Sequence, residues 1–248
     1  WYTKSIYTHL FRYSSNPETT LGWAIENRLL LLQPLIPQLE QPHLEPKIHL
    51  TPEEIEEAKD FLKGYEVDLS KPILMVGVLG SGPSKSYPLD YLAETLNTIA
   101  EQFDGTILLN YIPSQKNEVA QLLAKCSEKT QTVIREDVFC PSLRSFLSVL
   151  NLCSGYYGNE GGATNMSKAL GLPNFSIFAP WISKKGWLTY NTNPKNQGVH
   201  LSDFDASIND IPKKERKKEV QVFYRRLRPE LFKKPLLQFI QSHVLTNQ

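Results

Sequence analysis

Cysteine is scarce in this chain, and its three copies follow no metal-binding spacing. Cys126, Cys140 and Cys153 each lie in or beside an apolar run, and none belongs to a CxxC or Cys/His pattern. This pattern argues against a structural zinc site. An odd and sparse cysteine count is typical of a reducing compartment, so we expect a cytoplasmic protein with no bound metal.

The chain also lacks a strong net charge and a long hydrophobic run. A formal net charge of +1 gives no overall electrostatic reason to expect a nucleic-acid partner. The longest apolar runs, such as residues 73–79, are far shorter than the roughly 20 residues that cross a bilayer. The chain begins with Trp1 and no signal-peptide pattern follows, so we expect the true N-terminus to lie upstream of this sequence.

Apolar residues are abundant enough for a large core. At 41% hydrophobic content, 248 residues fit one large domain, alone or with an appendage. Residues 20–33 predict a leucine-rich helix, and the prolines after it favour a linker: Pro34, Pro37, Pro42 and Pro46. Thr51, Pro52 and Glu54 then form a capping box, which predicts a helix that ends at Gly64.

Strands and helices alternate from residue 73 onward. Apolar runs predict strands over residues 73–79, 106–111, 132–134, 155–158 and 175–178. Helical patterns lie between and around them, over residues 88–103, 114–125, 141–152 and 163–170. This alternation predicts an α/β fold, a Rossmann-like doubly wound parallel sheet. Residues 213–243 predict two polar helices broken near Pro229.

The loop after the first predicted strand suits an anion. It contains Gly80, Ser81 and Lys85 just before a helix. Glycines let backbone N–H groups approach an anion, a hydroxyl donates, and the ammonium supplies a point charge. The loop lacks the GxxxxGK[ST] spacing of a P-loop. A tight turn with a solvated lysine is the alternative.

The loop after the fourth predicted strand adds a carboxylate at the same edge of the sheet. Glu160 precedes Gly161 and Gly162, which open a short helix whose N-terminal amides favour an anion. A carboxylate repels phosphate, so Glu160 is better suited to sugar hydroxyls. A ligand with phosphates and a sugar fits the two loops together. The alternative role for Glu160 is to cap the helix or interact with its dipole.

These two loops resemble the C-terminal half of glycosyltransferase family 9, typified by the ADP-heptose:lipopolysaccharide heptosyltransferases. Residues 85–88 (Lys-Ser-Tyr-Pro) match the family's Lys-x-aromatic-Pro element. Residues 160–165 correspond to its Asp-Thr-Gly-x-x-His segment, and residues 170–173 to the Leu-Gly-x-Pro that follows an alanine-rich helix. The likeness covers about residues 65–205.

The resemblance implies a GT-B glycosyltransferase and divides the chain into three parts. Residues 1–48 would be the end of the N-terminal acceptor domain and a linker, residues 49–210 the nucleotide-sugar-binding domain, and residues 211–248 closing helices. It implies inverting, metal-independent transfer of a heptose from ADP-heptose to a lipid-linked saccharide, with no cofactor beyond the donor. The family's catalytic base lies near the start of the N-terminal domain, so we expect this chain to bind donor and transfer little sugar.

The resemblance also assigns the candidate residues to parts of the donor. The diphosphate would lie between two groups of residues: Gly80, Ser81 and Lys85 on one loop, and Gly161, Gly162 and Ala163 on the other. Glu160 would bind the transferred sugar and Gln115 would lie near the ribose. Ser142 and Leu143 would lie near the base.

Three departures from the family pattern leave the sugar open. Glu160 replaces aspartate, Gly161 replaces threonine, and Asn165, the last candidate residue, replaces histidine. A transferase of the same fold with another nucleotide sugar, or a noncatalytic nucleotide- or phosphosugar-binding module, remains the alternative.

Basic residues cluster near the C-terminus: Lys213, Lys214, Arg216, Lys217, Lys218, Arg225, Arg226, Arg228, Lys233 and Lys234. Such a cluster suits anionic headgroups at the inner-membrane face or phosphorylated sugars. The alternative is a solvated helical face.

Overall fold

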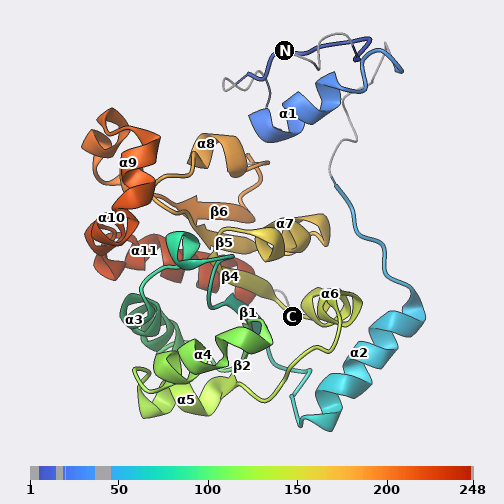
Figure 1. Cartoon of the computed structure of the whole chain (residues 1–248). Coiled ribbons are helices and arrows are strands. Elements are labelled where there is room, and N and C mark those ends of the chain that lie inside the picture. The colour runs from blue at the N-terminus through green and yellow to red at the C-terminus, as the bar shows by residue number, and fades with distance from the viewer. Residues whose placement is uncertain (1–5, 15–18, 20, 37–45, 191, 247–248) are drawn as a thin grey trace.

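One parallel sheet organises the molecule (Figure 1). The computed structural model describes residues 6–14, 19, 21–36, 46–190 and 192–246. The sheet has six strands: β1 Ile73–Gly77, β2 Thr106–Asn110, β3 Ile134–Arg135, β4 Gly155–Asn159, β5 Asn174–Ile177 and β6 Asn196–Val199. Their order is β3-β2-β1-β4-β5-β6 and every pairing is parallel. The order reverses between β1 and β4, as in Rossmann folds, so the predicted fold class is confirmed.

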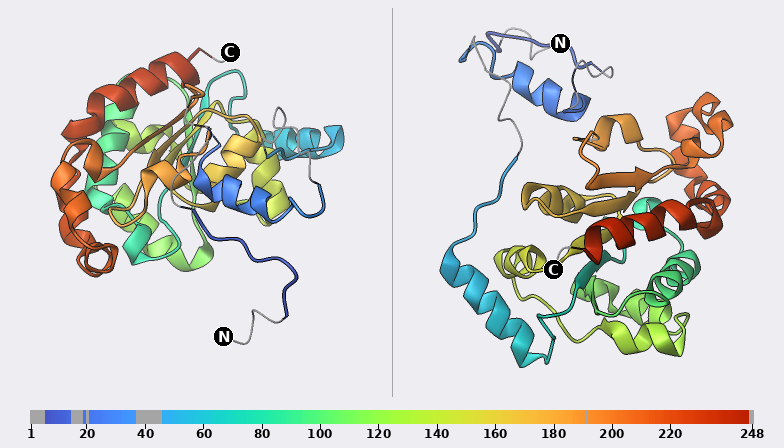
Figure 2. Two further views of the ribbon diagram at one scale, coloured as in Figure 1. Left: turned by 90° about the horizontal axis from the view of Figure 1, so that it is seen from above. Right: turned by 180° about the vertical axis from the view of Figure 1, so that it is seen from behind.

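Helices cover both faces of the sheet (Figures 1 and 2). One face carries α2 Pro52–Gly64, α6 Leu143–Asn151 and α7 Gly162–Ala169. The other carries α3 Leu89–Ala100, α4 Lys116–Leu123, α10 Val220–Arg226 and α11 Pro229–Phe239. Alternate residues of β1 serve the two cores, because Met75 packs with the first set of helices and Leu74 and Val76 with the second.

The capping box at the start of α2 forms as predicted. The Glu54 amide donates to the Thr51 hydroxyl at 3.2 Å, and the Glu54 carboxylate accepts from the Thr51 amide at 2.8 Å. Two free backbone donors are thereby satisfied.

Two strand predictions differ from the structure. Residues 132 and 133 end a helix, α5 Glu128–Val133, whose cap Ser127 accepts a hydrogen bond from the Thr130 amide. The third strand therefore starts only at Ile134. The edge strand β6 was not predicted, because its sequence Asn-Gln-Gly-Val has no apolar alternation. Its pairing with β5 stabilises it.

The described residues of the N-terminal segment include the helix α1 Trp23–Leu30, which lies inside the predicted range. It packs on α8 Lys184–Trp187, where the Trp23 indole occupies the space that a side chain at Gly186 would need. Of the linker prolines, Pro37 and Pro42 lie outside the described residues.

The C-terminal segment forms α9 Lys213–Lys218, α10 and α11, then a π-helical turn, η7 Ile240–Val244. The predicted break before Pro229 is present, but there are three helices instead of two. They are not simply polar, because Phe232, Leu236 and Phe239 are buried in the same core as the sheet. Short 3-10 turns complete the fold: η3 Pro83–Lys85, η4 Pro113–Gln115, η5 Leu201–Asp203 and η6 Ala206–Asp210.

Candidate functional site

The two candidate loops leave neighbouring strands at the point where the strand order reverses. β1 pairs with β4, and Gly77 lies opposite Gly158 at their carboxyl ends. Gly158 has a φ of 144°, and a Cβ atom there would overlap the backbone of Gly77. Position 158 therefore requires glycine. The loops that follow β1 and β4 begin next to it, at the place where open α/β sheets bind ligands.

A buried asparagine fixes the two loops to each other. The Asn159 side chain, only 2% exposed, donates to the carbonyls of Gly77 and Val78 at 3.2 and 3.0 Å. Its oxygen accepts from the Tyr87 amide at 2.7 Å. Asn159 has no role among the residues predicted from the sequence. A polar residue that ends a buried strand was the available signal.

Glu160 and Lys85 face each other across the two loops. The Lys85 ammonium lies 3.7 Å from Oε2 of Glu160, whose side chain is 6% exposed. Among the described residues, that oxygen accepts no hydrogen bond. The cap of α7 is Gly161, with no side-chain hydrogen bond, so Glu160 does not cap the helix. A buried acceptor of this kind is stabilised by a ligand that donates to it.

The first loop is closed by its own residues. Gly80 is required because a Cβ atom would overlap the Lys85 backbone. Its amide donates to the Ser86 hydroxyl at 3.1 Å, which in turn donates to the Gly82 carbonyl at 3.0 Å. The Gly80 amide is thus already bonded, whereas the Ser81 hydroxyl and the Lys85 ammonium are among the donors that this loop can offer a ligand.

Gln115 bridges two of the loops at this edge. Its amide nitrogen donates to the Gly80 carbonyl at 3.4 Å, and its oxygen accepts from the Ile112 amide at 3.1 Å. The structure therefore brings Gln115 to the first loop, as a link between the segments that follow β1 and β2.

A crevice of about 390 Å³ opens beside these loops. Its walls come from residues 110–113, residues 138–143, and Ala163 and Met166 of α7. The rings of Tyr111 and Phe139, two of its lining residues, lie 5.7 Å apart. A slot with apolar and aromatic walls suits a flat heterocycle.

Two candidate residues, Ser142 and Leu143, line this crevice. The Ser142 hydroxyl accepts from the Ser145 amide at 3.0 Å and caps α6. Leu143 is 62% exposed. An exposed leucine at the mouth of an apolar crevice is available to cover a bound ring.

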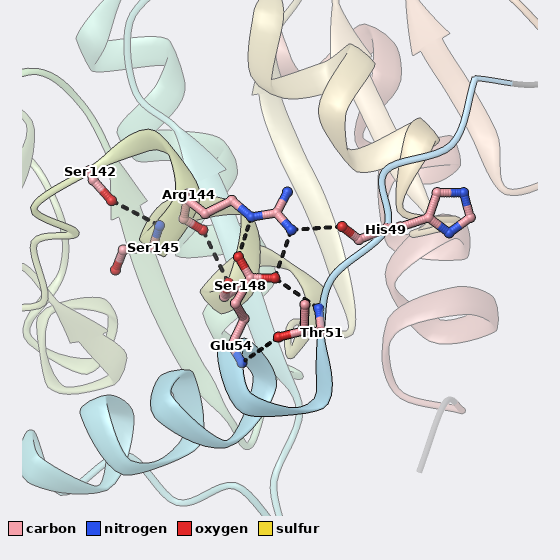
Figure 3. A network of polar contacts seen from close by, with 7 residues as sticks. All are labelled: His49, Thr51, Glu54, Ser142, Arg144, Ser145 and Ser148. Carbon is pink, nitrogen blue, oxygen red and sulfur yellow. Dashed lines mark hydrogen bonds and ion pairs between the residues drawn. The ribbon is translucent and has the colours of Figure 1, made fainter.

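An arginine anchors the start of α6 beside the crevice (Figure 3). The Arg144 guanidinium pairs with both carboxylate oxygens of Glu54 and donates to the His49 carbonyl at 2.7 Å. Hydrogen bonds from Arg144, and from the Thr51 backbone, lower the pKa of Glu54 to about 2. α2 and α6 are thereby held together at the crevice edge.

Part of the C-terminal basic cluster faces the first loop. The Trp181 indole donates to the Ser84 carbonyl at 2.7 Å. The ammonium groups of Lys85, Lys213 and Lys217 lie 5.8, 5.5 and 4.9 Å from its ring centre. Three positive charges thus gather at the candidate phosphate loop. Sequence reasoning missed this, since α9 is more than a hundred residues away in the chain.

Other members of the cluster have carboxylate partners. Arg225 pairs with Asp90 and Arg226 with Asp205.

Each helix in the described part of the chain is too short or too polar to cross a membrane.

The remaining candidates lie on α7. A Cβ atom on Gly161 would meet no atom within 4 Å, and one on Gly162 would meet only the Met166 methyl at 3.5 Å. The fold therefore leaves space above the helix start. Asn165 is placed elsewhere, on the wall of a second cavity shared with Lys168 and Arg28. Among the described residues, no three His, Cys, Asp or Glu side chains are grouped to hold a metal ion.

The fold is shared with solved glycosyltransferase structures. A family 9 glycosyltransferase from Veillonella parvula aligns with a TM-score of 0.68 at 12% identity, over 95% of this chain and 62% of its own length. The ADP-heptose lipopolysaccharide heptosyltransferase II of E. coli aligns with a TM-score of 0.54 at 16% identity. That alignment covers 76% of this chain and 56% of the E. coli protein.

No family model matches the sequence. No match was found among curated proteins either. The chain spans about three fifths of the length of the two glycosyltransferases, and at these identities the likeness establishes the fold.

Proposed function

We propose that this chain binds a nucleoside-diphosphate sugar and forms the donor-binding part of a glycosyltransferase of the heptosyltransferase type. The observation that carries the proposal is the facing pair Lys85 and Glu160 at the switch point of a Rossmann-like sheet. A cation for phosphate and an acceptor for sugar hydroxyls stand side by side, and the aromatic crevice opens next to them.

The donor lies across the carboxyl edge of the sheet in this proposal. The base enters the crevice beside Ser142 and Leu143, and the ribose lies near Gln115. The diphosphate lies between the first loop and the first turn of α7, whose amides favour an anion. Lys213 and Lys217 add positive charge at the phosphate loop. The transferred sugar donates hydroxyl hydrogen bonds to Glu160.

Transfer from such a donor releases a nucleoside diphosphate, and cations at the phosphate loop stabilise the charge that develops on it. We propose inverting, metal-independent transfer of a heptose from ADP-heptose to a lipopolysaccharide-type acceptor at the inner-membrane face. The similarity to family 9 transferases supports this choice. The catalytic base, which deprotonates the acceptor hydroxyl, belongs to the N-terminal domain of a GT-B enzyme.

Calorimetry with ADP and ADP-heptose tests the donor site. Lys85→Ala is expected to weaken ADP binding by about tenfold or more, because a charge-assisted hydrogen bond contributes about 1.5–3 kcal/mol. Lys125→Ala, which removes an exposed lysine on another face, is the matched control and should bind as the wild type does. Equal affinities for both variants would show that Lys85 holds no phosphate.

The sugar and the nucleotide are tested in the same assay. UDP- and GDP-sugars that bind more tightly than ADP-heptose would favour a transferase of the same fold with another donor. Tight donor binding, without transfer when a complete N-terminal domain is supplied, would favour a noncatalytic module.

A further inference from the structure

A second cavity, of about 270 Å³, lies away from the crevice, between α1 and the distal half of α7. Four polar or aromatic residues on its wall matter here: Arg28, Asn165, Lys168 and Trp187. No Asp or Glu of the described residues lines it. α1 lies against α8 (Figures 1 and 2), and its residues Ala24, Ile25 and Arg28 line the cavity. It shares no lining residue with the crevice.

Lys168 is poorly satisfied at the wall of this cavity. Its ammonium has two long contacts, to the Trp187 carbonyl at 3.5 Å and the Thr189 hydroxyl at 3.4 Å. No carboxylate of the described residues lies within ion-pair distance of it. Burial lowers the pKa of Lys168 to about 8, partly offset by the charge of Glu160. An ammonium with three donors in such a place is stabilised by an anion.

The other walls of the cavity supply a guanidinium, an amide and an indole face, which are groups that can bind a phosphorylated sugar. The Arg28 guanidinium lies over the Trp187 ring, 6.0 Å from its centre, and a guanidinium can bind a phosphate through two parallel hydrogen bonds. The Asn165 side chain is exposed and makes no hydrogen bond with the described residues. Amides can bind ring hydroxyls, and an indole face can stack on a sugar ring.

We propose that this cavity is a second binding site, which takes a small phosphorylated sugar. Lys168 and Arg28 hold the phosphate oxygens, and Asn165 and Trp187 contact the ring. The volume accommodates one phosphorylated monosaccharide, not a nucleotide sugar. The site is separate from the donor site and does not depend on the proposed function.

Calorimetry with glucose 6-phosphate as the probe tests the site on the full chain. Glucuronate, glucose and inorganic phosphate are the comparison ligands, and ADP binding reports on the donor site. Lys168→Met keeps the length of the side chain and removes its charge. Lys185→Met, on the exposed side of α8, makes the same charge change outside the cavity. Arg28→Met tests the opposite wall.

Lys168→Met and Arg28→Met are each expected to weaken glucose 6-phosphate binding by about tenfold, with ADP binding unchanged. Lys185→Met should bind like the wild type. Glucuronate binding as tight as glucose 6-phosphate would support the anion site and identify a carboxylate as an equal occupant. The proposal fails if glucose binds as tightly as its phosphate, if glucose 6-phosphate does not bind, or if Lys168→Met and Lys185→Met behave alike. The outcome for Lys85→Ala and ADP tests the donor site only. It has no bearing on whether the second cavity binds glucose 6-phosphate.

Discussion

Two glycines, Gly158 near the end of β4 and Gly161 at the start of α7, differ in how well they tolerate a side chain. Gly158 has a positive φ and touches the backbone of Gly77, whereas Gly161 is extended and has open space around it. We expect Gly158→Ala to lower the free energy of unfolding by on the order of 3 kcal/mol, from backbone strain and overlap. Gly161→Ala should cost about 1 kcal/mol or less, because Gly161 is the N-cap of α7 and has room for a methyl group. Urea unfolding measures both.

Gly161→Ala should nevertheless weaken ADP binding, since its methyl group enters the space where the phosphates approach the α7 amides. Unaltered ADP affinity in this folded variant would contradict a phosphate position above the start of α7.

At the residue scale, the charged residues of the candidate site could be picked out from the sequence, but the hydrogen bonds that hold its loops in place could not. Lys85 and Glu160 attract notice because each lies near two glycines in a loop after a buried strand, at the edge where parallel sheets bind ligands. Asn159 depends on three backbone groups in two other segments, so its role becomes visible only in the folded chain. The hydrogen bond from the Gly80 amide to the Ser86 hydroxyl likewise depends on the turn between these two residues.

The contact between α2 and α6 has a pH dependence that can be measured. The pKa of Glu54 falls from an ordinary 4.5 to about 2, first because of Arg144 and then because of the Thr51 backbone. Ionised Glu54 therefore stabilises the folded state fully above about pH 5, and this contribution is lost as pH falls toward 2. Arg144→Met should be less stable than the wild type at pH 7, with a smaller difference at pH 3.

Urea midpoints at pH 7, 5 and 3 test this expectation. Arg228→Met removes an exposed guanidinium that has no carboxylate partner among the described residues, and its difference from the wild type should not change in the same way. A deficit in Arg144→Met that is equal at pH 7 and pH 3 would assign the effect to the hydrogen bond with His49 instead of the ion pair.

At the element scale, patterns with a local cause were predictable. The capping box of α2 and the apolar run of β1 need only neighbouring residues. β6 could not be predicted, because Asn196 and Gly198 become part of a strand through pairing with β5. α5 was hidden because Thr130, Thr132 and Val133 are strand-forming residues that a serine cap places in a helix.

At the scale of the whole molecule, the C-terminal helices belong to the core of the sheet domain. Tyr87, in the segment that resembles family 9, donates its hydroxyl hydrogen to the Leu227 carbonyl at 2.5 Å and contacts the rings of Tyr224 and Phe232. The segment before α3 is thus packed against α10 and α11 behind the first loop. In the sequence, the apolar positions of α11 are interrupted by Lys233, Lys234 and Pro235, which obscures its buried face.

The N-terminal segment, in contrast, contributes little to the folding of the sheet domain. Among the described residues, neither apolar cluster contains one before Ala58, and Ala24 is the one buried core hydrophobic before residue 46. A variant lacking residues 1–47 should therefore unfold cooperatively within about 5 °C of the full chain and bind ADP equally well. It should lose glucose 6-phosphate binding, because Arg28 and α1 form one wall of the second cavity.

Deleting residues 229–248 instead removes Phe232, Leu236 and Phe239 from the core and should abolish the cooperative transition. Calorimetric unfolding of the two truncations decides this: loss of the transition in the N-terminal truncation would show that α1 is part of the folding unit.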